Sequence, residues 1–234
     1  MRRLIALVGT VLLGAQALGA QVQTKTFDLG AHVGQQVFAK GMALENGPFM
    51  GLDATYQLPW NPLAGLVKGA TFGVGLTIDV SRPVTRGDQF PLVAFDFGDT
   101  TFLYAVAQRT TLLQSGLQAV VGIPVGKVRL YGFAGPGIYS FFLDPRAMGK
   151  NEKFSNSLVG YGGGLNYAIS STIGFRAEAK MVTYTNFDRG RLDATQSYIR
   201  DQRILDATAK PDATTKTPTN MQYSLVFQYI PGGK

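Results

Sequence analysis

The segment Met221-Gln-Tyr-Ser-Leu-Val-Phe-Gln-Tyr229 alternates strictly between two kinds of position. Its odd positions carry only large apolar or aromatic side chains. Its even positions are mostly polar: Gln222, Ser224, Val226 and Gln228. Successive side chains of a β-strand point to opposite faces. The segment is therefore predicted to be a strand with one apolar face and one mostly polar face.

The same two-residue period recurs along the chain, and it predicts strands at 27–33, 50–58, 69–80, 111–123, 157–169 and 173–183. Segment 128–142 also has the composition of a strand, but both of its faces are apolar. Leu130 and Ile138 share one face, and Tyr131 and Phe141 share the other. A bulge near Gly135-Pro136-Gly137 would switch the faces, so the phase of this strand stays open.

The eight strands are joined by connections that alternate in length. The short ones are expected near 59–62, 124–127 and 169–172, and the longer ones at 39–48, 82–110, 143–154 and 188–219. Outer-membrane barrels show this asymmetry between periplasmic turns and outer loops. Segment 92–110 is expected to extend its hairpin beyond the membrane, and 194–209 could form a short helix.

The composition favours a protein that meets lipid through alternate residues. Charged residues make up 16% of the chain, against about 25% in an average soluble domain, and Gly reaches 29 of 234. The net charge of +7 is scattered, which disfavours nucleic-acid binding. The chain has no Cys, so disulfides, thiolate catalysis and Cys-based metal sites are excluded.

The N-terminus has the three parts of a secretory signal peptide. Arg2 and Arg3 precede an apolar stretch, and small residues follow. We expect a signal at 1–20, cleaved between 17 and 21, and one barrel domain at 21–234. No later segment has 18 consecutive apolar residues, so no transmembrane helix is expected.

These features together resemble the small outer-membrane β-barrels of the OmpA and OmpX type. The resemblance rests on the signal, the alternating strands, the order of turns and loops, and the aromatic-ended last strand Tyr223-Ser-Leu-Val-Phe-Gln-Tyr229. It covers about residues 25–230 and has no diagnostic motif. It implies an all-β, eight-stranded, antiparallel up-and-down transmembrane barrel in a bacterial outer membrane. This chain continues past its terminal aromatic residue with Ile230-Pro-Gly-Gly-Lys234, which the family often lacks.

A polar cluster is expected inside the barrel. Arg176, Glu178 and Lys180 alternate with apolar residues on one strand, so they point the same way. Asp53, Asp79 and Arg129 could meet them in the lumen, where isolated charges are costly and should pair. An eight-stranded barrel is just wide enough for side chains to fill, which favours an ion-paired plug over an ion path or gate.

Aromatic residues near strand ends are expected to form the girdle at the membrane interface. They are Tyr56, Trp60, Tyr161, Tyr167, Phe175, Phe227 and Tyr229. The alternative is the aromatic core of a soluble lipocalin-like barrel, whose outer polar face would be richer in Lys and Glu.

No catalytic constellation is evident. His32 is the only His, and pairing it with Ser81 or Ser115 would be an unsupported assumption about the fold. Gly160-Tyr-Gly-Gly-Gly164 lacks the Lys-Ser/Thr ending of a phosphate loop. Asp96, Asp99 and Asp144 lack the spacing of a Ca²⁺ loop. We expect no catalytic, metal or cofactor site.

Four functions remain open from the sequence. The leading one is a non-enzymatic outer-membrane barrel with a structural or surface-interaction role. The others are a narrow channel or carrier for small molecules, a lipid A-modifying enzyme, and a soluble lipocalin-like binder. The expected partners are outer-membrane lipid and, during biogenesis, the barrel-assembly machinery, and the expected state is a monomer.

Overall fold

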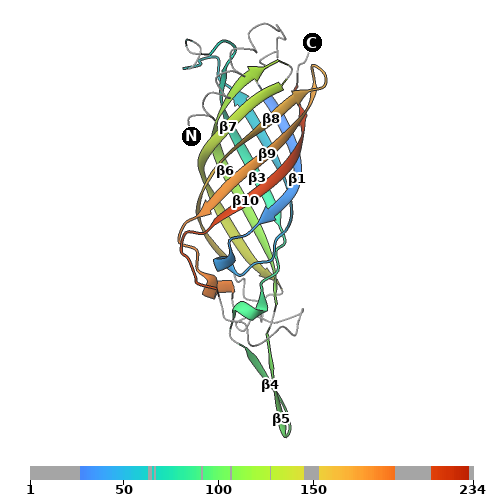
Figure 1. Cartoon of the computed structure of the whole chain (residues 1–234), viewed down its shortest axis with the longest axis vertical. Coiled ribbons are helices and arrows are strands. Elements are labelled where there is room, and N and C mark those ends of the chain that lie inside the picture. Colours follow the sequence, from blue (N-terminus) through green and yellow to red (C-terminus); the bar gives the residue numbers. More distant parts are fainter. Residues whose placement is uncertain are drawn as a thin grey trace, which may run out of the picture.

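Eight antiparallel strands close into a barrel in the computed structural model of the chain (Figure 1). The structure describes residues 27–62, 65, 67–90, 92–105, 107–126, 128–144, 153–192 and 212–231. The barrel strands are β1 (Phe27–Val37), β2 (Gly47–Gln57), β3 (Thr71–Ser81), β6 (Arg109–Val125), β7 (Val128–Asp144), β8 (Lys153–Ala168), β9 (Ile173–Tyr184) and β10 (Thr219–Tyr229). Their order around the wall is β1-β10-β9-β8-β7-β6-β3-β2. The predicted fold class is therefore confirmed.

The register of the strands determines the tilt of the barrel. A path of successive outward-facing partners can be followed once around the wall. It passes through Phe27, Tyr56, Val74, Ala119, Ala134, Tyr161, Met181, Met221 and Val37. One circuit starts at Phe27 and returns to β1 at Val37, a shift of 37 − 27 = 10 residues. Ten residues at about 3.3 Å each, on strands tilted by about 40°, rise roughly 25 Å along the barrel axis. That height equals the apolar band of outer-membrane barrels, about 25 Å.

Large apolar side chains cover the outside of this band. Leu225, Leu52 and Val33 are 65%, 64% and 62% exposed. Their inward neighbours on the same strands are buried, among them Val226, Asp28 and His32. The wall therefore presents apolar residues to lipid and encloses mainly polar ones. This arrangement excludes the soluble lipocalin-like alternative, in which the apolar face would be buried.

The polarity of the two faces inverts at the outer end of several strands. On β9, Arg176 and Lys180 point inward and Phe175 points outward. Farther along the same strand, Val182 and Tyr184 are the buried residues. Exposed hydroxyl groups pair on the outside there: Thr183 with Thr219 at 2.9 Å and Ser157 with Thr185 at 2.6 Å. This end of the barrel has a dry interior and a wet exterior, as a soluble protein has.

An apolar cluster fills the lumen at this end, and we call it the outer apolar cluster. It consists of Phe38, Met42, Ala43, Leu44, Phe90, Leu112, Tyr139, Phe141, Leu143, Phe154, Leu158, Val182, Tyr184, Phe187 and Leu192. Tyr139 and Tyr184 stack with ring centroids 4.3 Å apart, and Phe141 stacks on Phe154 at 5.1 Å. Loop residues around the 3₁₀ turns η2 (Lys40–Met42) and η5 (Arg189–Leu192) complete it.

The inversion explains why the phase of segment 128–142 was ambiguous. Along β7, Leu130 and Ile138 are exposed, whereas Phe133, Tyr139 and Phe141 are buried. The pairing of β7 with β6 and with β8 keeps one register from end to end, so no bulge lies at Gly135-Pro136-Gly137. Both faces are apolar because the outward face meets lipid along one part of the strand and the inward face packs in the outer apolar cluster along another.

The connections differ partly from the expectation. The β6–β7 turn and the β8–β9 turn are short, as predicted. Residues 58–70 separate β2 from β3, and this connection is longer than the short turn predicted near 59–62. At the opposite end, the β3–β6 connection contains η3 (Gly87–Gln89) and a two-stranded hairpin of β4 (Val93–Phe97) and β5 (Thr100–Tyr104). The hairpin projects away from the barrel (Figure 1), which confirms the predicted extension.

Other predictions fall on parts of the chain that are not described. The signal peptide at 1–20 and the short helix at 194–209 lie outside the described residues. Within the described residues, the structure has no helix of the length and apolarity needed to cross a bilayer.

Candidate functional site

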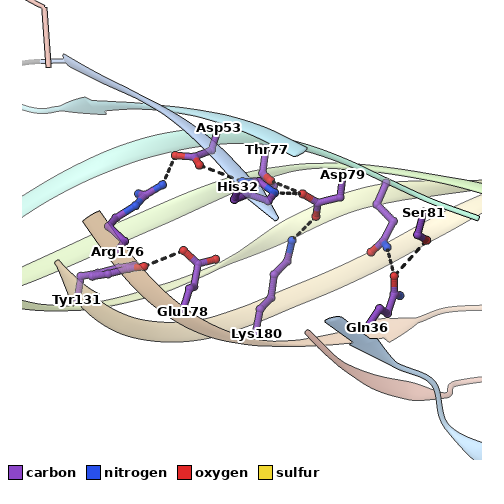
Figure 2. A network of polar contacts seen from close by, with 11 residues as sticks. His32, Gln36, Asp53, Thr77, Asp79, Ser81, Tyr131, Arg176, Glu178 and Lys180 are labelled. Carbon is purple, nitrogen blue, oxygen red and sulfur yellow. Dashed lines mark hydrogen bonds and ion pairs between the residues drawn. The ribbon is translucent and has the colours of Figure 1, made fainter. Parts of the chain in front are cut away.

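A chain of polar contacts crosses the lumen in the membrane-spanning part of the barrel (Figure 2). We call it the lumen network, and it comprises His32, Asp53, Asp79, Tyr131, Arg176, Glu178 and Lys180. These residues come from β1, β2, β3, β7 and β9, so strands distant in sequence meet there. Six of them point inward because they occupy the polar phase of an alternating strand. Tyr131 shares the inward face of β7 with Phe133 and Tyr139.

His32 lies at the centre of the network between two carboxylates. Its Nε2 lies 2.6 Å from Asp79 Oδ1, and its Nδ1 lies 3.3 Å from Asp53 Oδ2. An imidazole donates from both ring nitrogens only when both are protonated. In that form, three cationic groups (His32, Arg176, Lys180) balance three carboxylates (Asp53, Asp79, Glu178).

Each of the two aspartates also binds a cation from β9. Arg176 Nη2 donates to Asp53 Oδ1, and Lys180 Nζ lies 2.9 Å from Asp79 Oδ2. Thr77 adds a hydrogen bond of 3.2 Å to Asp79. Asp79 thus accepts from three side chains while it is 1% exposed. Buried charges are tolerated when they are paired and hydrogen-bonded in this way.

Glu178 has a different partner from the one expected. Among the described residues it joins no ion pair, and its Oε2 accepts a hydrogen bond of 2.7 Å from the Tyr131 hydroxyl. The expectation that the lumen charges pair with one another therefore holds for Asp53 and Asp79, but Glu178 forms no direct ion pair among the described residues. Strand spacing shows that residues i and i+2 share a face, but their side chains reach across the lumen to other strands.

Two glycines make room for the network. A Cβ on Gly30 would lie 2.7 Å from Asp53 Oδ1 and 2.8 Å from Arg176 Nη2. A Cβ on Gly51 would lie 2.6 Å from Asp79 Oδ1. These distances are all shorter than van der Waals contact, so the two inward positions must lack a side chain for the carboxylates to reach their partners.

Arg129 is separate from the network. It lies near the end of the barrel where β1 begins, beside a cavity of about 30 Å³ that Asp28, Gln57 and Gln228 also line. Its Nε and Nη2 atoms, like Asp28 Oδ1, have no hydrogen-bond partner in the described part of the chain. A cavity of this size holds one or two water molecules, which would bridge these atoms. Sequence reasoning did not single out Asp28, which shares the inward phase of His32.

The cavities found among the described residues of the lumen are small. The one along the lumen network has a volume of about 20 Å³. Toward the outer end, Gln36 accepts from Ser81 at 3.3 Å and donates to the Tyr184 hydroxyl at 3.3 Å. The outer apolar cluster then closes the lumen. The described interior is thus a packed core with room for scattered water molecules.

The predicted girdle residues divide into two groups. Phe175 pairs with both Tyr167 and Phe227, and Tyr56 pairs with Phe27, all near the end where β1 begins. Tyr229 ends β10 at the same level, and Trp60 packs edge-to-face on Phe72 with centroids 6.2 Å apart. Tyr161 instead lies in the middle of β8, between Ala134 and Met181. It faces outward but does not lie at a strand end.

The geometry gives no support to a Ser-His pair. Ser81 Oγ donates to Gln36, and Ser115 lies on the outward phase of β6, between Ile78 and Ile138. Both ring nitrogens of His32 are in contact with carboxylates, those of Asp53 and Asp79. Among the described residues, no group of three or more His, Asp or Glu side chains is placed to hold a metal ion.

Comparison with known families identifies the fold. The family model described as "outer membrane protein beta-barrel domain" matches residues 4–201. The chain belongs to this outer-membrane β-barrel family. Membership places it in the bacterial outer membrane and confirms the predicted resemblance to small outer-membrane barrels.

One solved structure supports the same fold, and two others show a weaker similarity. Neisserial surface protein A (NspA) is 12% identical, with a TM-score of 0.51 over 88% of this chain and 97% of that one. The attachment invasion locus protein Ail of Yersinia pestis is 11% identical (TM-score 0.42; 88% and 100% covered). OprG of Pseudomonas aeruginosa is 13% identical (TM-score 0.42; 88% and 96% covered). No curated protein matches the sequence.

Proposed function

We propose that this barrel is a closed, non-enzymatic anchor that presents a binding surface outside the cell. The observation that carries the proposal is the outer apolar cluster. It fills the outer end of the lumen with fully buried rings such as Tyr139, Phe141 and Tyr184. An ion entering from outside would have to cross this dry region, where burial of an unpaired charge is very costly.

The outer parts of the structure support a role at the cell surface. Short periplasmic turns and long outer loops are the rule in this family, so the end bearing the β4–β5 hairpin faces outward (Figure 1). The polarity inversion shows that several strands continue into water there with a core of their own. A structural plug alone would not require a projecting hairpin.

Conductance in planar lipid bilayers tests the closed state. Wild-type protein should give no discrete openings in 1 M KCl. Combined Tyr139→Gly and Phe141→Gly replacement, which removes two rings of the outer apolar cluster, should produce small openings. Steady openings of the wild-type barrel would instead favour the narrow-channel alternative, for which the water-sized cavities of the lumen are the supporting observation.

Adhesion of expressing cells tests the surface role. Replacement of residues 93–104 by a Gly-Ser turn should leave the heat-modifiable gel mobility of the barrel unchanged. It should also reduce attachment of the cells to immobilised glycans and surface proteins. Equal attachment with and without the hairpin, across all coated surfaces, would contradict a binding role for this element.

A further inference from the structure

An open apolar groove runs over the lipid-facing side of the wall across β9, β10, β1, β2 and β3. Its volume is about 1030 Å³, at the upper end of ordinary ligand sites, about 300–1,000 Å³. The outward side chains that line it are Val33, Met50, Val80, Ala177, Tyr223 and Leu225. Ala177 pairs with Leu165 on one side and Leu225 on the other, so a small residue stands between two large ones.

One polar side chain faces the groove from within the apolar band. Gln35 is exposed and has the outward phase of Val33. Below the level of the paired hydroxyls, the outward positions of the eight described strands are apolar or Gly except for Gln35 and Ser115. The Gln35 amide has no hydrogen-bond partner among the described residues. An unpaired amide in hydrocarbon is costly, so its presence indicates a polar group in whatever fills the groove.

The depth of Gln35 suggests what that polar group is. Gln35 lies two residues before Val37, where the apolar band ends. In a lipid, the ester or amide that joins an acyl chain to its headgroup lies at the edge of the hydrocarbon, about 5 Å farther out, which is within reach of an extended Gln side chain. The Gln35 Nε2 can donate to the carbonyl of such a linkage.

The outer edge of the groove is suited to a headgroup. Arg82 follows β3, is exposed and lines this edge. The Thr183–Thr219 hydroxyl pair lies at the outer ends of β9 and β10. A guanidinium binds phosphate with several donors in a fixed geometry, and the hydroxyls offer donors and acceptors to sugars.

We propose that this groove binds an acyl chain of a phosphate-bearing glycolipid in the outer leaflet. The chain lies against Val33, Met50 and Leu225, the linkage carbonyl accepts from Gln35, and the phosphate contacts Arg82. The site is on the outside of the barrel, so it stands independently of the closed lumen and of the hairpin.

Native mass spectrometry of the purified barrel in a neutral detergent, with diphosphorylated lipid A as the probe, tests the site. The wild type should retain one lipid A. Ala177→Trp, which fills the groove, should weaken binding at least tenfold, and Gln35→Leu several-fold. The matched controls are Ala134→Trp and Ser115→Leu, which change outward positions on β7 and β6 and should leave binding unchanged. Heat-modifiable mobility verifies that each variant has folded.

The headgroup is tested separately. Wild-type barrel should bind diphosphorylated lipid A more tightly than phosphatidylcholine, and Arg82→Gln should reduce this preference, whereas Arg109→Gln should not. Equal loss of lipid A in Ala177→Trp and Ala134→Trp would overturn the site. So would a dimer of the barrel that Ala177→Trp dissociates, because the groove would then be filled by a second copy.

Discussion

At the scale of single residues, the lumen is stabilised by carboxylates that differ in the number of donors from which they accept. Asp79 accepts from His32, Thr77 and Lys180, and Asp53 accepts from His32 and Arg176. Glu178 accepts a hydrogen bond from the neutral hydroxyl of Tyr131. The three acids are therefore unequal, although all three lie on inward positions.

This inequality predicts different costs for two conservative substitutions. Asp79→Asn leaves Lys180 and His32 short of a buried counter-charge and should cost about 3–5 kcal/mol, the usual cost of breaking a buried pair. Glu178→Gln keeps an oxygen for Tyr131 and should cost roughly 1 kcal/mol. Urea titrations followed by the fluorescence of Trp60, the single Trp, would measure both. Equal costs would show that the lumen holds free counter-ions.

The depth of a lipid-facing residue should decide how well it tolerates a charge. Leu225 is 65% exposed in the apolar band, whereas Thr219, on the same face of β10, lies at its outer edge. Leu225→Arg should destabilise the barrel by about 2–4 kcal/mol and Thr219→Arg by about 0–1 kcal/mol. Refolding titrations into lipid vesicles compare the two. Equal effects would mean that the outward face does not meet hydrocarbon.

At the scale of elements, a single strand passes through two environments, lipid in the membrane and water beyond it. β9 carries charged inward residues in the membrane and apolar inward residues beyond it. The surrounding solvent changes from lipid to water along the strand, and the interior changes in the opposite sense. This is why a strand such as β7 shows no single amphipathic face.

The outer apolar cluster should therefore contribute to stability as a soluble core does. Tyr184 is fully buried and stacks on Tyr139. Tyr184→Ala should cost about 3–5 kcal/mol, as large-to-small core substitutions do. Thr183→Ala, which changes its half-buried, outward-facing neighbour, should cost less than about 1 kcal/mol. Urea unfolding in detergent micelles measures both, and similar small losses would show that the cluster is not packed in solution.

The orientation of the barrel can be tested on its hairpin. An epitope inserted between Gly98 and Asp99, at the tip of β4–β5, should bind antibody on intact cells. The same epitope inserted between Ser170 and Thr172, in the β8–β9 turn, should bind only after the outer membrane is permeabilised. The reverse pattern would invert the topology.

At the scale of the whole molecule, the length of the apolar outward face sets the membrane thickness that the barrel fits. The circuit of outward residues from Phe27 to Val37 spans roughly 25 Å, and hydroxyl pairs begin directly above it. Aromatic residues near the start of β1 mark one edge of this band and the hydroxyls mark the other.

Folding yield should depend on bilayer thickness accordingly. Saturated phosphatidylcholines with 12- or 14-carbon chains should give more folded barrel than 18-carbon ones at the same temperature above melting, because a mismatched bilayer must deform. The fraction migrating as the heat-modifiable form measures the yield. A maximum in the thickest bilayer would contradict the register-based height.

The alternation of residues by itself determined the eight strands, their antiparallel order and the outward faces of most of them, since a period of two is a local property of the chain. The same alternation predicted that five polar side chains point into the lumen: Asp53, Asp79, Arg176, Glu178 and Lys180. The 58–70 connection was misjudged because Pro59 and Pro62 indicate a turn without fixing its length.

Only the tertiary structure decided which partners meet. Closure of the barrel brings His32 of β1 between Asp53 of β2 and Asp79 of β3. It also places Glu178 where it accepts a hydrogen bond from Tyr131 of β7. These choices depend on the ten-residue shear, which no single strand encodes, because it arises from the summed registers of all eight pairs. The phase of β7 depended on closure as well, since only the closed barrel shows where its surroundings change from lipid to water.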